Sequence, residues 1–209
     1  MDTATEAHRI TDIAALEKLY GLPAGASVDK EIDHLHPHYQ RLITASPFFV
    51  LATGGPGGMD ASPRGDAPGF VVVEDAKTLL IPDRRGNNRV DSLRNIIVNP
   101  QVALLFLIPG VSETLRVNGR AEIRTDPALL ERFRVDGKPP RSVLVVHVET
   151  VFFQCARAIF RSKLWDPERH IERASLPSLG TIISDITHAR FDGQEYDKGL
   201  YERLRGALY

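Results

Sequence analysis

Short runs of apolar and β-branched residues, separated by turn signals, dominate the middle of this 209-residue chain. These runs lie at residues 48–53, 69–73, 78–81, 102–108, 114–123 and 143–149. Many short strands with few long helices favour an antiparallel barrel over a doubly wound parallel sheet. The segment 54–58, which reads GGPGG, predicts a tight turn directly after the first run. We therefore expect a mainly β fold with attached helices, a barrel of about six antiparallel strands with Greek-key-like connections.

Helical patterns flank this region on both sides. Apolar residues fall on one helical face over residues 13–20, and a second helical pattern runs over residues 28–43, where Pro37 should kink or divide it. We expect one domain over residues 1–209. It would carry an N-terminal helical extension of about residues 1–45 and a C-terminal helical tail of about residues 166–209.

Two further helices are predicted between the strands. One covers residues 88–98 and ends before an Asn-Pro pair, and the other begins at Asp126, where proline follows the N-cap. The first of them opens directly behind a polar loop that leaves the strand at residues 78–81. Such a helix start presents free backbone N–H groups and a favourable dipole to an anion.

Composition narrows the class of protein. Lysine and arginine total 26 against 27 acidic residues, so bulk charge gives no reason to expect nucleic-acid or membrane binding. One cysteine, Cys155, permits no intrachain disulfide, and its apolar neighbours suggest a small core residue. The polar N-terminus lacks a signal core, and residues 102–108 are too short a run to span a bilayer. We expect a cytoplasmic protein.

The strongest chemical signal is the loop that follows the strand at residues 78–81. It carries Arg84, Arg85 and Arg89, and arginine suits phosphate through paired hydrogen bonds. Arg84 and Arg85 could equally be a solvated loop. Arg89 is less easily explained that way, because the dipole of a helix start disfavours a cation unless an anion is near.

Three weaker signals remain open. Residues 112–122 alternate like a half-buried strand, and residues 157–165 interleave cations with the one tryptophan, which suits either an aromatic phosphate ligand or an amphipathic helix. His34 and His38 have the spacing of zinc ligands on a helix, but Pro37 interrupts that helix. We therefore predict no metal site.

The stretch TLLIPDRRGNNRVDSLRNIIVNPQVALLFLIPG, followed by SETLRVNGRAEI, resembles the centre of the pyridoxamine 5'-phosphate oxidase-like flavoproteins. The resemblance covers about residues 46–125 closely. It implies an FMN-binding split β-barrel and a homodimer whose FMN sites lie at the subunit interface. The segment RSKLWDP resembles a branch of that family known only as probable FMN-dependent enzymes.

The resemblance also implies roles for particular residues. Ile81, Pro82 and Asp83 would line the isoalloxazine edge, while the partner subunit would supply Thr114 and Leu115. The positions implied for the rest of the cofactor are Arg64, Asn87, Asn88 and Arg89 near the phosphate, and Arg161, Ser162, Lys163 and Trp165 from the branch pattern. Asn88 stands where the family's basic pair would have a cation, so part of the positive charge must come from elsewhere.

The departures from the family pattern bear on the substrate. The chain ends in GLYERLRGALY and lacks the C-terminal Arg-Leu and proline signature of true pyridoxamine-phosphate oxidases. The resemblance therefore implies an FMN-dependent oxidoreductase that acts on an unidentified small molecule, in which the flavin carries the chemistry. The alternatives are a flavin-binding sensor without turnover, or a split-barrel relative that uses F420 or haem.

Overall fold

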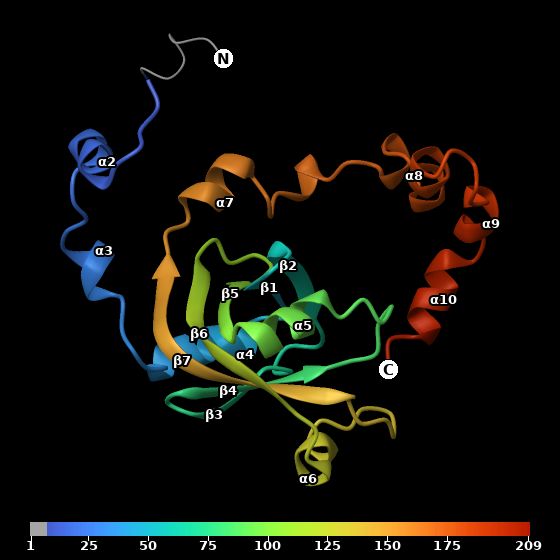
Figure 1. Cartoon of the computed structure of the whole chain (residues 1–209), viewed down its shortest axis with the longest axis horizontal. Coiled ribbons are helices and arrows are strands. Elements are labelled where there is room, and N and C mark those ends of the chain that lie inside the picture. Colours follow the sequence, from blue (N-terminus) through green and yellow to red (C-terminus); the bar gives the residue numbers. More distant parts are fainter. Residues whose placement is uncertain (1–7) are drawn as a thin grey trace.

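Seven strands form one antiparallel sheet in the order β2-β1-β5-β6-β7-β4-β3. The computed structural model describes residues 8–209, so the first seven residues of the predicted N-terminal extension lie outside the described residues. The strands are β1 Phe48–Gly55, β2 Gly58–Gly65, β3 Val72–Asp75, β4 Thr78–Asp83, β5 Gln101–Leu107, β6 Thr114–Arg124 and β7 Ser142–Gln154. Figure 1 shows the sheet curling into a barrel, which confirms the predicted antiparallel barrel with attached helices.

The barrel interior follows from the alternation of side chains along each strand. In β1 and β5 every second residue is buried, which places Phe49 and Phe106 inside with ring centroids 5.1 Å apart. Leu104, Val117 and Val146 fill the same core and are fully buried. Burying a side chain of this size contributes about 1.5–3 kcal/mol, so this core is the main source of barrel stability.

A bulge bends the two longest strands. The register of β6 and β7 shifts between Asn118 and Gly119. At Gly119 an added Cβ would lie 2.1 Å from the main-chain oxygen of His147, so only glycine allows this close approach of the two backbones. The bulge increases the local twist and helps the sheet to curl.

The helices attach to the barrel unequally. They are α2 Ile13–Tyr20, α3 Ala26–Asp29, α4 Pro37–Ala45, α5 Asp91–Val98, α6 Pro127–Glu131, α7 Arg157–Ser162, α8 Leu179–Ile186, α9 Gly193–Asp197 and α10 Leu200–Gly206. Helix α4 buries Tyr39 and Ile43, and α5 buries Ile96 against the core. These two helices cover the barrel, whereas α2, α3 and α10 bury no side chain.

Three sequence predictions of local structure were wrong in detail. The pattern over residues 28–43 is divided near Pro37 as predicted, but residues 30–36 are not helical, and Pro37 begins α4 in its first turn. Helix α5 starts at Asp91, since Asn88 adopts a left-handed conformation with φ of 62°. Strand β2 was not predicted as such, because its sequence GMDASPRG has few β-branched residues and is held by pairing with β1.

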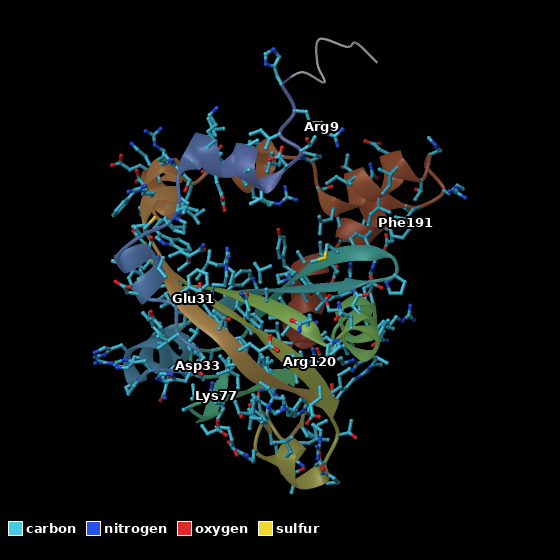
Figure 2. All side chains as sticks on the ribbon, turned by 60° about the vertical axis from the view of Figure 1, so that its left-hand side comes forward. Arg9, Glu31, Asp33, Lys77, Arg120 and Phe191 are labelled. Atoms are coloured by element: carbon cyan, nitrogen blue, oxygen red, sulfur yellow. The ribbon has the colours of Figure 1, made fainter. Side chains whose placement is uncertain are left out.

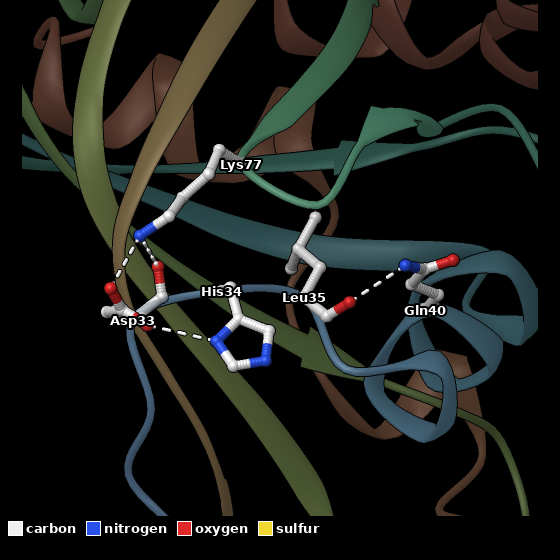
Figure 3. A network of polar contacts seen from close by, with 5 residues as sticks. All are labelled: Asp33, His34, Leu35, Gln40 and Lys77. Atoms are coloured by element: carbon white, nitrogen blue, oxygen red, sulfur yellow. Dashed lines mark hydrogen bonds and ion pairs between the residues drawn. The ribbon is translucent and has the colours of Figure 1, made fainter.

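A polar network ties the segment before α4 to the turn between β3 and β4 (Figure 3). Lys77 Nζ lies 2.7 Å from an Asp33 carboxylate oxygen, and His34 Nδ1 lies 2.9 Å from the other. The backbone N–H of Leu35 donates to the Ala76 carbonyl, 2.7 Å away, and Gln40 Nε2 donates to the Leu35 carbonyl. The hydrogen bonds from Lys77 and then His34 lower the pKa of Asp33 to about 2.

Two segments extend away from the barrel on the same side (Figures 1 and 2). The N-terminal arm, residues 8–30, carries α2 and α3, and the C-terminal arm, residues 157–209, carries α7 to α10. Figure 2 marks them by Arg9 and Phe191, above the barrel on which Asp33 and Lys77 lie. No helix within residues 8–209 is long and apolar enough to cross a membrane.

Candidate functional site

An open pocket of about 220 Å³ lies where β4 leads into α5. The strand register places it beside the start of β7, because Asp83 pairs with Ser142. Its walls come from β2, the end of β4, the loop before α5, α5 itself and the start of β7. The lining residues are Ser62, Arg64, Asp83, Arg84, Gly86, Asn87, Asn88, Arg89, Val90, Leu93, Arg141 and Ser142.

Arg64 joins two strands that are far apart in the sheet order. Its Nη1 lies 2.5 Å from Asp83 Oδ1, which connects edge strand β2 with β4. Its Nε is buried and has no hydrogen-bond partner among the described residues. A buried donor without an acceptor costs roughly 1–3 kcal/mol.

Arg84 is fixed and not part of a solvated loop. Its Nε lies 3.0 Å from Asp66 Oδ2, and its Nη1 donates to the Phe133 carbonyl at 2.7 Å. Burial of Asp66 would raise the pKa of its carboxyl, but hydrogen bonds from Tyr209, the Ala67 amide and Arg84 outweigh it and lower that pKa. Arg85, in contrast, is exposed, so the solvated-loop alternative holds for Arg85 and fails for Arg84.

The loop before α5 shows how a cation, Arg89, is accommodated at a helix start. Arg89 Nε lies 2.5 Å from Asp91 Oδ2, a bond that raises the pKa of Arg89, so Asp91 provides the anion that a cation at this helix start needs. The backbone N–H of Arg89 donates to Asn87 Oδ1, which shapes the turn. The Arg89 side chain is 80% exposed and can turn toward a ligand.

Arg141 supplies an uncompensated positive charge. Its Nη1 donates to the amide oxygen of Asn88 at 2.8 Å, and it makes no ion pair within residues 8–209. Asn88 was expected to need a cation from elsewhere, and Arg141 is the cation that contacts it. The pocket thus gathers four arginines around one lining carboxylate, Asp83, which suits an anionic ligand.

The remaining predicted site residues lie elsewhere. Thr114 begins β6, where it pairs with Gln154 at the far end of β7 from Ser142. Trp165 lies near it, because the Trp165 Nε1–H donates to the Val111 carbonyl at 2.8 Å. Arg161 and Ser162 end α7, and Lys163 follows in a left-handed conformation with φ of 50°. None of these residues lines the pocket.

The length of β7 separates the two groups of predicted residues. Ser142 and Gln154 stand at opposite ends of this 13-residue strand. At about 3.3 Å per residue the strand spans roughly 40 Å along its path. One chain therefore brings together Arg64, Asp83, Asn87, Asn88 and Arg89, but it does not add Thr114 or the segment from Arg161 to Trp165 to them.

Three side chains among those singled out in the sequence are not placed to meet a ligand as first described. Ile81 and Leu115 are both 2% exposed and belong to the core, so only their backbone can face a ligand. Pro82 is also buried. Cys155 is exposed directly after β7, so its prediction as a core residue was wrong. Of the two phenylalanines near it, Phe152 is partly buried and Phe153 is exposed.

Several lining residues were not counted as part of the predicted site, among them Ser62, Arg84, Leu93, Arg141 and Ser142. Ser142 and Arg141 reach the pocket through the pairing of β4 with β7. This register sets Ser142 opposite Asp83 and brings Arg141 to Asn88. That register could not be derived from the sequence pattern, because β4 and β7 are separated by two strands and two helices.

Comparison with known proteins places the chain in a family. The sequence model of the family described as pyridoxamine 5'-phosphate oxidase matches residues 35–155, which is more than half of the chain. The match spans the barrel from just before α4 to just after β7. The protein belongs to this family, and its antiparallel sheet with attached helices is the family's split-barrel fold.

Solved structures of several proteins are similar to part of the chain. HupZ from Group A Streptococcus is 23% identical, with a TM-score of 0.46, over 56% of this chain and 92% of that chain. A Clostridium acetobutylicum protein related to general stress protein 26 is 19% identical over 56% and 85%, with a TM-score of 0.43. An FMN-binding protein from Syntrophomonas wolfei is 12% identical over 56% and 83%, also at 0.43. No curated protein matches the chain.

Proposed function

We propose that this protein binds FMN in the pocket between β4 and α5 and is an FMN-dependent oxidoreductase acting on a small molecule. The observation that carries the proposal is the group of four arginines that line the pocket, among them Arg141, which makes no ion pair within residues 8–209. This excess of positive charge calls for an anionic, oxygen-rich ligand. Membership of a family that includes oxidases supports a flavin as that ligand.

The residues present fit such a cofactor. Arg141 and the exposed side chain of Arg89 offer guanidinium groups for a phosphate, and arginine binds phosphate with paired hydrogen bonds. Arg64 lines the same pocket and adds to its positive charge. Bound FMN would supply hydride or electron transfer, and the protein would supply position and the exclusion of water.

A homodimer with shared sites completes the proposal. The cofactor residues suggested by the family resemblance form two groups at opposite ends of β7, so one ligand can contact both groups only if they come from two chains. Closed two-fold symmetry would then give two equivalent sites. The second group, Thr114 and the segment from Arg161 to Trp165, would come from the partner.

The surface area supports a second copy. The chain exposes 14329 Å². A compact monomer of 23.2 kDa is expected to expose roughly 9,700 Å². This surplus exceeds the 1,200–2,000 Å² or so that a standard interface buries. The two arms carry much of it, since α2 and α10 bury no side chain.

The cofactor is tested by titrating the purified protein with FMN and with riboflavin while the absorption spectrum is recorded. We expect an oxidised-flavin spectrum and tighter binding of FMN, because the arginines select for the phosphate. Equal affinity for the two flavins would contradict the phosphate assignment. A Soret band, or preference for F420, would replace FMN by one of the alternative cofactors.

Turnover and substrate need a separate test. Pyridoxamine 5'-phosphate and pyridoxine 5'-phosphate should be poor substrates, because the close family resemblance covers only the flavin-binding centre at about residues 46–125. The reduced flavin should nevertheless be reoxidised by an acceptor. A protein that binds FMN but shows no reduction with any donor would be a flavin-binding sensor.

A further inference from the structure

The C-terminal arm turns back toward the barrel at its end (Figure 1). There Tyr209 makes the arm's contacts with the barrel. The Tyr209 hydroxyl donates to Asp66 Oδ1 at 2.6 Å, and Lys138 Nζ donates to the main-chain oxygen of Tyr209 at 2.9 Å. The Arg84 guanidinium carbon lies 5.3 Å from the centroid of the Tyr209 ring. Tyr209 therefore contacts both members of the Asp66–Arg84 ion pair.

These contacts stand out because the arm beyond Trp165 makes no others like them with the barrel in the described part of the chain. Within the described residues, every hydrogen bond or ion pair that joins residues 166–209 to the barrel involves Tyr209. Helices α8 and α9 hold each other instead, with Gly180 packed against Gly193 and with Asp197 accepting from Ser178 and the Gly180 amide. The position of the arm's end thus depends on one residue.

Arg84 is the link from Tyr209 to the candidate flavin site. It lines the pocket, and three groups set its orientation: the Asp66 carboxylate, the Phe133 carbonyl and the Tyr209 ring. The two carboxylate oxygens of Asp66 have different partners: Oδ1 accepts from the Tyr209 hydroxyl, and Oδ2 accepts from Arg84 Nε. Tyr209 thereby keeps Asp66 turned so that its second oxygen faces Arg84.

We propose that Tyr209 is a positioning residue of the candidate flavin site, which acts through Asp66 and its own ring to hold the Arg84 guanidinium at the pocket wall. This inference rests on the proposed function, because it assigns the pocket to an anionic flavin. The bond to Asp66 raises the pKa of Tyr209, so the phenol stays protonated and remains a donor at neutral pH. The C-terminal arm would then be part of the site although it is outside the family's matched region.

The alternative is that Asp66 holds Arg84 without help. The Ala67 amide already donates to Asp66 Oδ1 at 2.8 Å and could keep the carboxylate in place. The two possibilities differ in what removal of the Tyr209 hydroxyl does to ligand selectivity. If Tyr209 only fastens the arm, its loss leaves the pocket unchanged.

The test compares the affinities for FMN and riboflavin of the full chain and of Tyr209→Phe, Asp66→Asn and the double variant. Tyr201→Phe is the matched control, because Tyr201 lies in α10 and is 60% exposed. We expect Tyr209→Phe to weaken FMN binding about three- to tenfold, the effect of one hydrogen bond, and riboflavin binding less. The double variant should bind no worse than Asp66→Asn, since both changes break one link.

Two outcomes would overturn the inference: unchanged FMN affinity in Tyr209→Phe, or an equal loss for FMN and riboflavin. Hydrogen exchange of the ligand-free protein separates this failure from failure of the proposed function. If Tyr209 positions Arg84, Tyr209→Phe should speed exchange in residues 84–90 as well as in residues 200–208. Faster exchange in α10 alone would show a fastening role, whether or not the wild-type protein binds FMN.

Discussion

The barrel and the two arms use similar apolar side chains in opposite ways. In the barrel, Phe49 and Phe106 are at most 1% exposed, whereas in the N-terminal arm Ile13 is 69% and Tyr20 is 78% exposed. The arm helices are nevertheless well formed at their ends, as the Asp12 side chain accepts from the Ala15 amide at 2.8 Å. Caps and periodicity can thus specify a helix that finds no core within its own chain. We propose that the arms complete their packing on a second copy.

Truncation of a core residue should give the largest effect. Phe106→Ala is expected to lower the free energy of unfolding by about 3–5 kcal/mol, because it removes a buried ring and leaves a cavity. Leu16→Ala in α2 should change it by less than about 0.5 kcal/mol in dilute protein, where the arm is uncovered. Denaturant titration at low concentration measures both. A large loss from Leu16→Ala would show that the arm already packs within one chain.

The next largest effect is expected on the free energy of dimerisation through the arms. Leu16→Asp should weaken dimerisation by about 1.5–3 kcal/mol, the value of burying one large apolar side chain. Sedimentation over a range of concentrations measures the dissociation constant, and Glu17→Asp serves as a control on the same helix. If the Leu16→Asp protein dimerises as tightly as the wild type, the arm is not part of the interface.

Removal of an arginine beside the barrel and removal of one in the C-terminal arm should affect FMN affinity differently. Arg89→Ala should weaken FMN binding by about 1.5–3 kcal/mol, the range for a hydrogen bond to a charged group. Arg161→Ala should weaken it only at concentrations where two chains associate, because Arg161 lies in the group assigned to the partner's site. Titrations at several protein concentrations test this. A concentration-independent effect of Arg161→Ala would contradict the shared site.

Asp91 gives a matched variant of opposite sign. Its carboxylate holds Arg89 in the absence of a ligand, so Asp91→Asn should free Arg89 and strengthen FMN binding. The gain should be smaller than the loss from Arg89→Ala, since exposed ion pairs contribute about 0–1 kcal/mol. Weaker FMN binding in Asp91→Asn would show that Asp91 itself shapes the loop for the ligand.

The smallest effect on the free energy of unfolding is expected from Asp33, at the junction between the N-terminal arm and the barrel. The pKa of Asp33 falls from its ordinary 3.8 to about 2 when the chain folds, mainly through the Lys77 hydrogen bond. The stabilisation is therefore present above pH 3.8 and is lost as the pH falls toward 2. Because the pair is exposed, Asp33→Asn should scarcely change stability at neutral pH, and salt should reduce the difference further. Denaturant titrations between pH 2 and 5 test the window.

Much of the fold could be predicted because its signals are local. Alternation in β1 and β5 and the GGPGG turn gave strand positions that lie within a few residues of those observed. Strand β2 was missed because its residues carry little intrinsic preference and become a strand by pairing with β1. The start of α5 was placed too early, because the turn at Asn87 and Asn88 is made by side-chain contacts that a periodicity argument cannot see.

The candidate site was predicted in part. The loop with Asn87, Asn88 and Arg89 lines the pocket, and so does Arg64, which was implied by the family resemblance and not by a local pattern. Arg141 reaches it from 52 residues beyond Arg89 through the pairing of β4 with β7, which no local pattern encodes. Tyr209 is farther still, and its contact with Asp66 depends on the whole path of the C-terminal arm.

The pairing of β4 with β7 also fixes an order of events during synthesis. The β3–β4 hairpin adds to the sheet only through β7, whose residues 142–154 are made some sixty residues later. A two-stranded hairpin is marginal by itself in water. On the ribosome, β1, β2, β5 and β6 can pair as they emerge, while residues 72–83 must wait. Nascent chains released before Ser142 should expose that hairpin to chaperones and proteases, and the barrel should close abruptly once β7 is free.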